Sequence, residues 1–211
     1  MDTSQIESMI AEKCGDPDAG SDIGQLLGVV ADRQGRDVSA AELEQGAQFV
    51  VGYIQLVPYM IKVAWTAAKS VGLEGPMQCI LDAVISYWLE DQDIIPDQLG
   101  IIGLLDDAYC SLTSLQVVSD HYQLQAGKYL FPDDLTGANR VMRKIIGEPY
   151  ASDLDRLVAG TMQNAGLLDA VKTLASPEKQ LDFSHKSTIW NHGPAGNLDL
   201  RDLGRFGLLD D

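Results

Sequence analysis

The sequence predicts an all-α fold, a single-domain helical bundle over residues 1–175 followed by a loop-rich C-terminal arm over residues 176–211. Three observations favour this class. Apolar residues recur at helical spacing along most of the chain, recognisable helix-start signals precede several of these segments, and no segment before Gly127 shows the alternation of a half-buried strand. With 211 residues, the chain is also long enough to bury a substantial core as one unit.

The first helices are expected to be short and acidic. A longer one follows, because Ser39 and Glu42 have the spacing of a capping box, in which each side chain bonds the backbone N–H of the other residue. The helical pattern that opens there continues to Trp65, and we expect it to form a central helix.

Between Ala47 and Ala68 this pattern is apolar nearly all round, which is typical of a buried helix or of a membrane span. Gln48, Gln55 and Lys62 disfavour the span, so membrane insertion is not expected. Pro58 should kink or divide the helix, because proline lacks the N–H donor and clashes with the preceding turn.

Four further helices are expected from the apolar spacing. They cover Met77 to Leu89, Ala108 to Gln125, Gly137 to Ile146 and Ser152 to Leu174. Beyond Ser176, glycine and proline interrupt any periodicity. The arm nevertheless keeps five large apolar residues, which is enough for it to dock on the body or on another subunit: Phe183, Trp190, Leu198, Leu203 and Phe206. A homo-oligomer is therefore left open.

Charge is distributed very unevenly. The formal net charge is −16, and residues 1–127 carry −14 of it. Residues 70–127 contain nine carboxylates and neither lysine nor arginine. An acidic chain repels phosphate backbones, so nucleic-acid binding is not expected, whereas a basic protein partner fits. The densest acidic cluster predicts a partner-binding face: Glu90, Asp91, Asp93 and Asp97.

Three cysteines, Cys14, Cys79 and Cys110, are widely spaced and form no CxxC pair, which disfavours a disulfide framework or a zinc knuckle. Reduced cysteines are typical of a cytoplasmic protein. The first residues also lack the basic and apolar regions of a secretory signal. We therefore expect a cytoplasmic location.

One segment carries a dense motif: Asp93-Ile94-Ile95-Pro96-Asp97, then Gly100-x-x-Gly103, then Leu105-Asp106-Asp107-Ala108. The order and spacing of these residues resemble the core motif of the YkvA-like family, whose members are small helical domains of unknown function. The resemblance covers residues 58–118. Many of those relatives are associated with membranes. This chain differs just before the motif, where Leu89-Glu90-Asp91-Gln92 replaces a more apolar, proline-containing step, and this difference weakens the expectation of membrane association. The resemblance implies a helical fold and supplies no reaction.

The aspartates of this motif allow three interpretations. They can hold a tight helix-loop-helix corner, with Asp106 and Asp107 capping the next helix and the two glycines allowing a close backbone approach. They can form part of the acidic partner-binding face. They can also supply oxygen ligands to a divalent cation, although their spacing is not that of a calcium loop. The candidate metal set is Asp93, Asp97, Asp106, Asp107 and His121.

These observations favour a non-enzymatic acidic binding protein, such as an antitoxin, an immunity protein or a regulator, that engages a basic protein. The alternative is a metal-assisted hydrolase built on Asp97, Asp106, Asp107 and His121. A peripheral membrane-associated protein is the second alternative. No catalytic residue is assigned, because the chain contains no G-x-S-x-G elbow, no H-E-x-x-H helix and no phosphate-binding loop at Gly20, Gly24 and Gly28.

Overall fold

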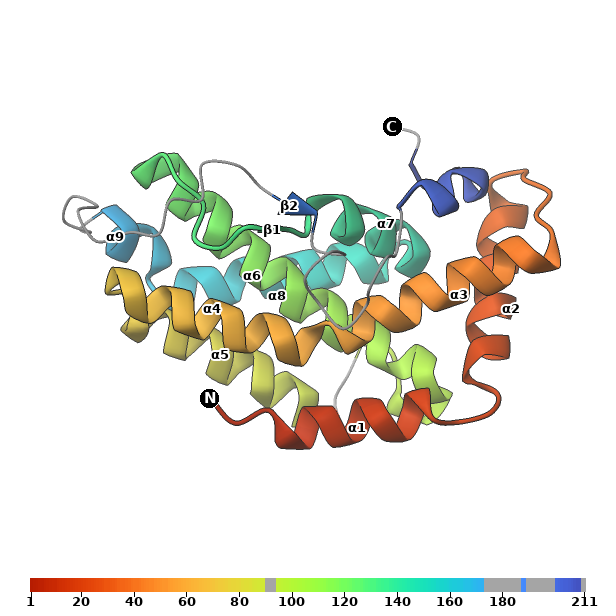
Figure 1. The fold of residues 1–211 in the computed structure, drawn as a ribbon, viewed down its shortest axis with the longest axis horizontal. Coiled ribbons are helices and arrows are strands. Elements are labelled where there is room, and N and C mark those ends of the chain that lie inside the picture. The colour runs from red at the N-terminus through yellow and green to blue at the C-terminus, as the bar shows by residue number, and fades with distance from the viewer. Residues whose placement is uncertain (90–93, 173–186, 189–199, 210–211) are drawn as a thin grey trace.

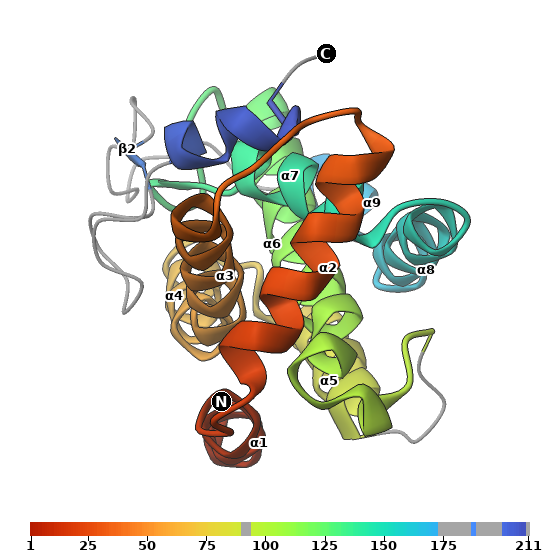
Figure 2. The ribbon, with the colours of Figure 1, turned by 90° about the vertical axis from the view of Figure 1, so that its right-hand side faces the viewer.

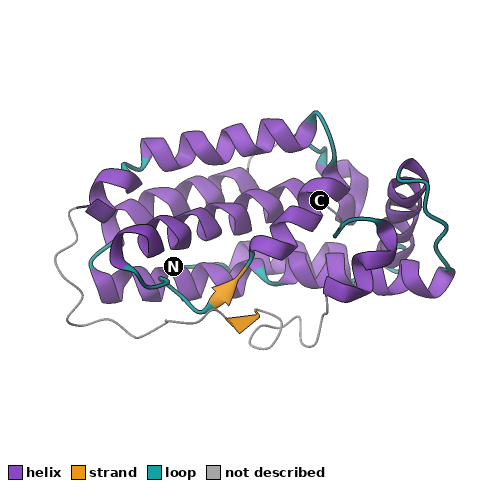
Figure 3. Cartoon of the chain, turned by 90° about the horizontal axis from the view of Figure 1, so that it is seen from above, coloured by secondary structure: helices purple, strands orange, loops and turns teal. Residues whose placement is uncertain are grey.

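A computed structural model describes residues 1–89, 94–172, 187–188 and 200–209, and α-helices dominate it (Figure 1). The helical elements are α1 Ser4–Cys14, α2 Ala19–Arg33, α3 Ala40–Gln55, α4 Val57–Val71, α5 Glu74–Leu89, η1 Asp97–Leu104, α6 Leu105–Ala126, α7 Thr136–Ile146, α8 Tyr150–Asn164, α9 Leu167–Lys172 and η3 Leu200–Phe206. Two-residue strands β1 Asp133–Asp134 and β2 Ser187–Thr188 form one short parallel pair (Figure 3). The predicted all-α class is confirmed.

The central helix is α6. Figure 2 shows it between α3 and α4 on one side and α8 on the other, and α5, α7, α9 and η1 also contact it. The segment opened at Ser39, which was predicted to be a central helix, packs against α6 and contributes Phe49, Tyr53 and Ile54 to the core. That segment keeps a solvent-facing side with Gln48, Gln55 and Lys62 exposed, whereas α6 is covered on all sides over most of its length.

The polar residues of α6 are the reason why its central position was not predicted from the sequence. Ser111 and Gln116 are both buried, and hydrogen bonds satisfy them. Trp88 Nε1 donates to Ser111 Oγ at 2.9 Å, and the backbone N–H of Leu135 donates to Gln116 Oε1 at 2.8 Å. A buried polar group is tolerated once it is hydrogen-bonded. This helix can therefore be central although its surface is not apolar on every side.

The expected start and division of the next helical stretch are both confirmed. Ser39 caps α3, and the Ser39–Glu42 capping box is present in full. The chain leaves α3 at Gln55 and enters α4 at Val57, with Pro58 in the first turn of α4. Proline is favoured there because the first N–H groups of a helix have no intrahelical acceptor.

Two segments are long and apolar enough to cross a membrane, Ala40–Val71 and Gln98–Ala126. Within the protein, 61% and 83% of their most apolar windows are buried. Core helices of soluble proteins have the same length and composition, so these segments are weak evidence for a span.

The single helix expected over Ser152 to Leu174 is instead broken. Helix α8 ends at Asn164 and α9 begins at Leu167, with Gly166 at a φ of 61° between them. L-residues rarely adopt this left-handed conformation, so the glycine permits the turn. Residues 173 and 174 lie outside the described part of the chain.

The C-terminal arm docks on the body at its described end. Leu203, Phe206 and Leu208 are buried and belong to the same apolar core as the helices. Helix η3 contacts α3 and α2, and Arg205 Nε pairs with Glu42 at 3.0 Å. Of the two docking surfaces left open by the sequence, the body of the same chain is the one that the structure shows.

Candidate functional site

The aspartate motif forms a structural corner between α5 and α6. Asp106 lies in the first turn of α6 with no exposed surface. Its Oδ2 atom accepts hydrogen bonds from the Tyr87 hydroxyl and from the backbone N–H of Ile95, each at 2.9 Å. Burial raises the pKa of Asp106, and these hydrogen bonds oppose that shift. Asp106 therefore closes the connection between the two helices.

The expectation that Asp106 and Asp107 cap the helix was wrong. The N-cap position of α6 is Leu104, which makes no side-chain cap bond, and both aspartates follow it in the first turn. Carboxylates there still interact favourably with the helix dipole. Asp107 is also buried, and its backbone carbonyl accepts from Ser111 Oγ at 2.7 Å. The corner interpretation of the motif is the one that this geometry supports.

The remaining acidic candidates lie wholly or partly outside the described residues. Glu90, Asp91 and Asp93 lie outside the described residues. Asp97 begins η1, after an N-cap at Pro96, and its side chain is likewise outside the description. Gly100 has a φ of 66°, and a Cβ atom placed on it would meet no neighbouring atom within 4 Å, so it serves the turn and not a close backbone approach.

His121 does not meet the aspartates. It lies fourteen residues after Asp107 on the same continuous helix, which is about 21 Å along the axis. One ion cannot bind both side chains. Among the described residues, no group of three or more histidine, cysteine, aspartate or glutamate side chains is placed to hold a metal ion.

His121 instead lines a cavity of about 680 Å³ between α6, α8 and α9, together with Asp155, Asp169 and Lys172. Its Nδ1 atom lies 2.8 Å from the Val117 carbonyl oxygen, so Nδ1 donates and only Nε2 is left for other partners. Asp155 is held by the fold, because Tyr109 and Arg143 donate to its two oxygens at 2.6 and 2.8 Å. Both oxygens of Asp155 are therefore already engaged within the fold.

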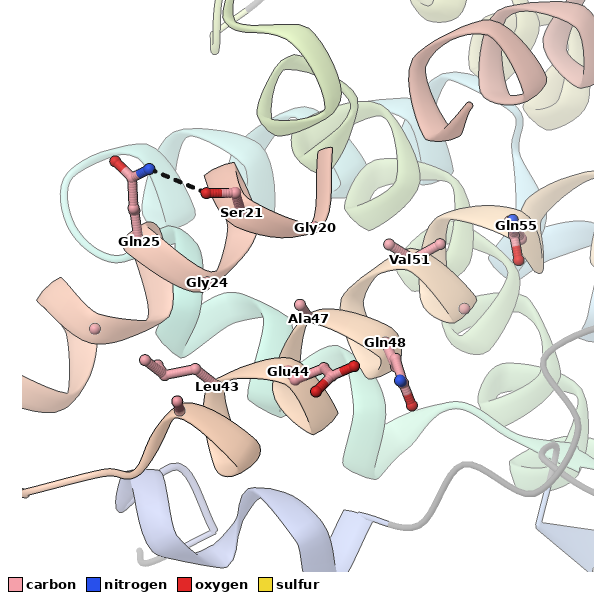
Figure 4. Close-up of a pocket in the computed structure, with 13 residues that line it drawn as sticks. Gly20, Ser21, Gly24, Gln25, Leu43, Glu44, Ala47, Gln48, Val51 and Gln55 are labelled. Atoms are coloured by element: carbon pink, nitrogen blue, oxygen red, sulfur yellow. Dashed lines mark hydrogen bonds between the residues drawn. The ribbon is translucent and has the colours of Figure 1, made fainter. Parts of the chain in front are cut away.

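A groove of about 950 Å³ lies between α2 and α3 and is called here the α2–α3 groove (Figure 4). Helix α2 crosses the end of α3 at the right of Figure 1. The lining residues from α2 are Gly20, Ser21, Gly24, Gln25 and Gly28, and those from α3 are Ala40, Leu43, Glu44, Ala47, Gln48, Val51, Gly52 and Gln55. Small residues form its walls, and Ser21, Gln25, Glu44 and Gln48 form a polar rim.

The α2–α3 groove is acidic. Glu44 contributes its charge, and neither lysine nor arginine is among the described residues that line it. Asp32 follows Gly28 by four residues, so it extends the glycine row of α2 toward the end of the helix. Asp32, Asp37 and Glu44 are exposed, and so are Arg33 and Arg36, which lie beside Asp32 and Asp37 in the sequence.

Sequence reasoning missed this groove, although a signal was present. A phosphate-binding loop was the only ligand site considered for Gly20, Gly24 and Gly28, and their neighbours do not fit such a loop. The same spacing of four residues places all three on one face of a helix, where glycines leave the backbone open to a close neighbour. Whether such a row is buried internally or left open depends on which helix packs beside it, and the sequence does not specify that.

The fold and this site define a class: an all-α protein with a groove between two helices that carries Glu44 in its rim. Comparisons with protein-family models, curated proteins and solved structures found no match. The resemblance to the YkvA-like family therefore stays a prediction that rests on the motif of residues 93–108.

Proposed function

We propose that this protein is a non-enzymatic, cytoplasmic binding protein that engages a basic protein partner, as an antitoxin, an immunity protein or a regulator does. The observation that carries the proposal is the net charge of −14 on residues 1–127, the part of the chain that includes both walls of the α2–α3 groove and Glu44 in its rim.

Such a charge distribution acts mainly on the rate of association. Long-range attraction between an acidic and a basic surface raises the association rate constant, and salt screens this attraction over about 10 Å at 0.1 M ionic strength. Rim charges that stay hydrated in the complex contribute little to its lifetime. The partner should therefore bind faster at low salt, with a smaller change in its dissociation rate.

The same charge disfavours the competing classes of partner. Nucleic acids and the anionic cytoplasmic leaflet of a membrane both attract clusters of lysine and arginine, and residues 70–127 contain neither. A basic protein is the class of macromolecule that gains most from the acidic surface.

The first experiment is capture of the tagged, full-length chain from its native cells in low salt, followed by a salt step and identification of the eluted protein. We expect a stoichiometric basic protein. Its association with the purified chain is then measured by stopped flow as a function of salt. An empty eluate from a folded protein, or an association rate that does not depend on salt, contradicts the proposal.

Charge-reversal variants locate the acidic surface that the partner uses. The triple variant Asp32→Lys, Asp37→Lys and Glu44→Lys should slow association by about tenfold or more and change dissociation less. The control is Asp169→Lys, because Asp169 is 91% exposed on α9 and its reversal changes charge away from the α2–α3 groove.

A double variant, Asp91→Lys with Asp93→Lys, tests the acidic face predicted from the sequence. Slow association in this variant alone would place the partner at the residues around Glu90 and Asp97 and not at the groove.

A further inference from the structure

Three glycines of α2 have no internal steric reason to be glycine. A Cβ atom built at Gly20, Gly24 or Gly28 meets no neighbouring atom within 4 Å. Gly46 on α3 is the contrasting case, because its Cβ would lie 2.7 Å from Leu27 Cδ1 and 3.1 Å from Phe206 Cζ. Internal packing therefore accounts for Gly46 and does not account for the three glycines of the α2–α3 groove.

The three glycines are unfavourable for α2 itself. Glycine lowers helix stability relative to alanine because its unfolded backbone has more freedom to lose. Their shared consequence is a helix face without side chains, on which another backbone can lie closer than the usual separation of about 8–10 Å between helix axes. This face opens onto a cavity of about 950 Å³ and not onto flat surface.

The dimensions of the α2–α3 groove suit a helix. Its α3 wall extends from Ala40 to Gln55, which is about 22 Å along the helix axis and matches about fifteen residues of a docked helix. Leu43 and Val51 are half-buried on that wall. They offer apolar contacts to a helix whose large residues recur at helical spacing, the helix-in-groove mode of recognition.

The net negative charge of the chain indicates which kind of helix would dock in the α2–α3 groove. A second copy of this chain would bring another net charge of −16 toward a groove that carries the carboxylate of Glu44, with Asp32 further along α2. Like charges facing one another across an interface are unfavourable. Lysine and arginine flanking the apolar stripe of a docked helix would instead lie beside these carboxylates.

We infer that the α2–α3 groove is a docking site for a basic amphipathic helix of the partner protein. Large apolar side chains of that helix lie over Gly20, Gly24 and Gly28, and its basic flank lies beside Glu44 and Asp32. This inference rests on the proposed function and specifies the binding surface and the form of the partner.

The test uses a fluorescein-labelled peptide of about fifteen residues, with leucine at positions i, i+3, i+4 and i+7 and lysine elsewhere. A peptide of the same composition with shuffled positions has equal charge and no apolar stripe. Fluorescence anisotropy with the full-length chain should show the amphipathic peptide binding about tenfold more tightly than the shuffled one. Equal affinities would overturn the docking site while leaving the electrostatic proposal in place.

Filling the α2–α3 groove provides the decisive variant. The double change Gly24→Leu with Gly28→Leu places side chains in the open space and should weaken binding of the amphipathic peptide by about tenfold or more. Gly160→Leu is the matched control, because Gly160 also lies in a helix with nothing within 4 Å of its Cβ position and lines neither the groove nor the cavity at His121. The control should bind like the wild type.

The remaining outcomes separate the two proposals. If the filled groove binds the amphipathic peptide as tightly as the wild type does, the docking site is wrong, and salt-dependent capture of a basic protein still tests the proposed function. If light scattering shows a dimer that the double leucine variant abolishes, the occupant is a second copy and the inference of a basic helix is overturned. A partner captured from cells must lose affinity for the same double variant.

Discussion

Asp106 Oδ2 lies 2.9 Å from the hydroxyl of Tyr87, so a carboxylate in the first turn of α6 accepts a hydrogen bond from the end of α5. The same oxygen accepts from the backbone N–H of Ile95, where the chain returns toward η1. Tyr87 and Ile95 precede Asp106 by nineteen and eleven residues, and both are thus bonded to one of its oxygen atoms. In the described structure, the motif of residues 93–108 therefore fixes the corner between α5 and α6.

Replacing Asp106 should destabilise the fold. Asp106→Ala leaves the partly buried Ile95 N–H and Tyr87 hydroxyl without their acceptor, which should lower the free energy of unfolding by about 2–4 kcal/mol. Tyr87→Phe removes one donor and should cost about 1–2 kcal/mol. Urea unfolding measures both. A loss below about 0.5 kcal/mol in Asp106→Ala would show that the corner is not held by this carboxylate.

The contribution of Asp106 to stability should depend on pH. Burial raises its pKa in the folded state above the ordinary value near 3.8. The folded protein then binds the proton more tightly than the unfolded chain, so this contribution is full below about pH 3.8 and is lost as the pH rises through the folded pKa.

The wild type should therefore gain stability relative to Asp106→Asn as the pH is lowered from neutrality toward about 4, because the amide does not titrate. Other carboxylates are present in both proteins and cancel in the difference. Urea midpoints of the two proteins at a series of pH values give the result. A difference that is constant, or that changes in the opposite direction, would mean that Asp106 is not held with a raised pKa.

Glycine substitutions should distinguish the open face of α2 from the packed face of α3. Gly24→Ala should stabilise the protein by about 0.5–1 kcal/mol, because the new methyl group meets no atom and favours the helix. Gly46→Leu should destabilise it by about 1–3 kcal/mol, because its side chain has to displace Leu27 and Phe206, which are fully buried. Thermal unfolding monitored by circular dichroism compares the two. Loss of stability in Gly24→Ala would mean that the groove is filled in the native protein.

Phe206 should hold the described end of the C-terminal arm on the body. It is fully buried against α3, whereas the Arg205–Glu42 pair beside it has an exposed cation and contributes little. Phe206→Ala removes a large buried ring and should release η3 before the helices unfold. Hydrogen exchange should then speed up in residues 200–209, with smaller changes in α6. Arg205→Ala is the control and should leave these exchange rates nearly unchanged.

The success of sequence-based prediction differed from element to element for physical reasons. The start of α3 and the division at Pro58 were predicted correctly because a capping box and a proline act through neighbouring residues. The break at Gly166 was missed, because a glycine within a helical pattern is compatible with either a helix or a turn. The central place of α6 was missed because two of its buried polar residues, Ser111 and Gln116, accept hydrogen bonds from Trp88 and Leu135 on other segments.

The sequence by itself determined the all-α class, the acidic character of residues 1–127 and the local signals that begin or divide helices. Only the tertiary structure decided that Asp106 closes a corner, that His121 lies about four turns from it, and that Gly20, Gly24 and Gly28 face an open groove. Composition and short-range spacing determine helices, because helix formation depends on nearby residues. A site depends on which helices lie side by side, and that arrangement is set by long-range packing of the whole core.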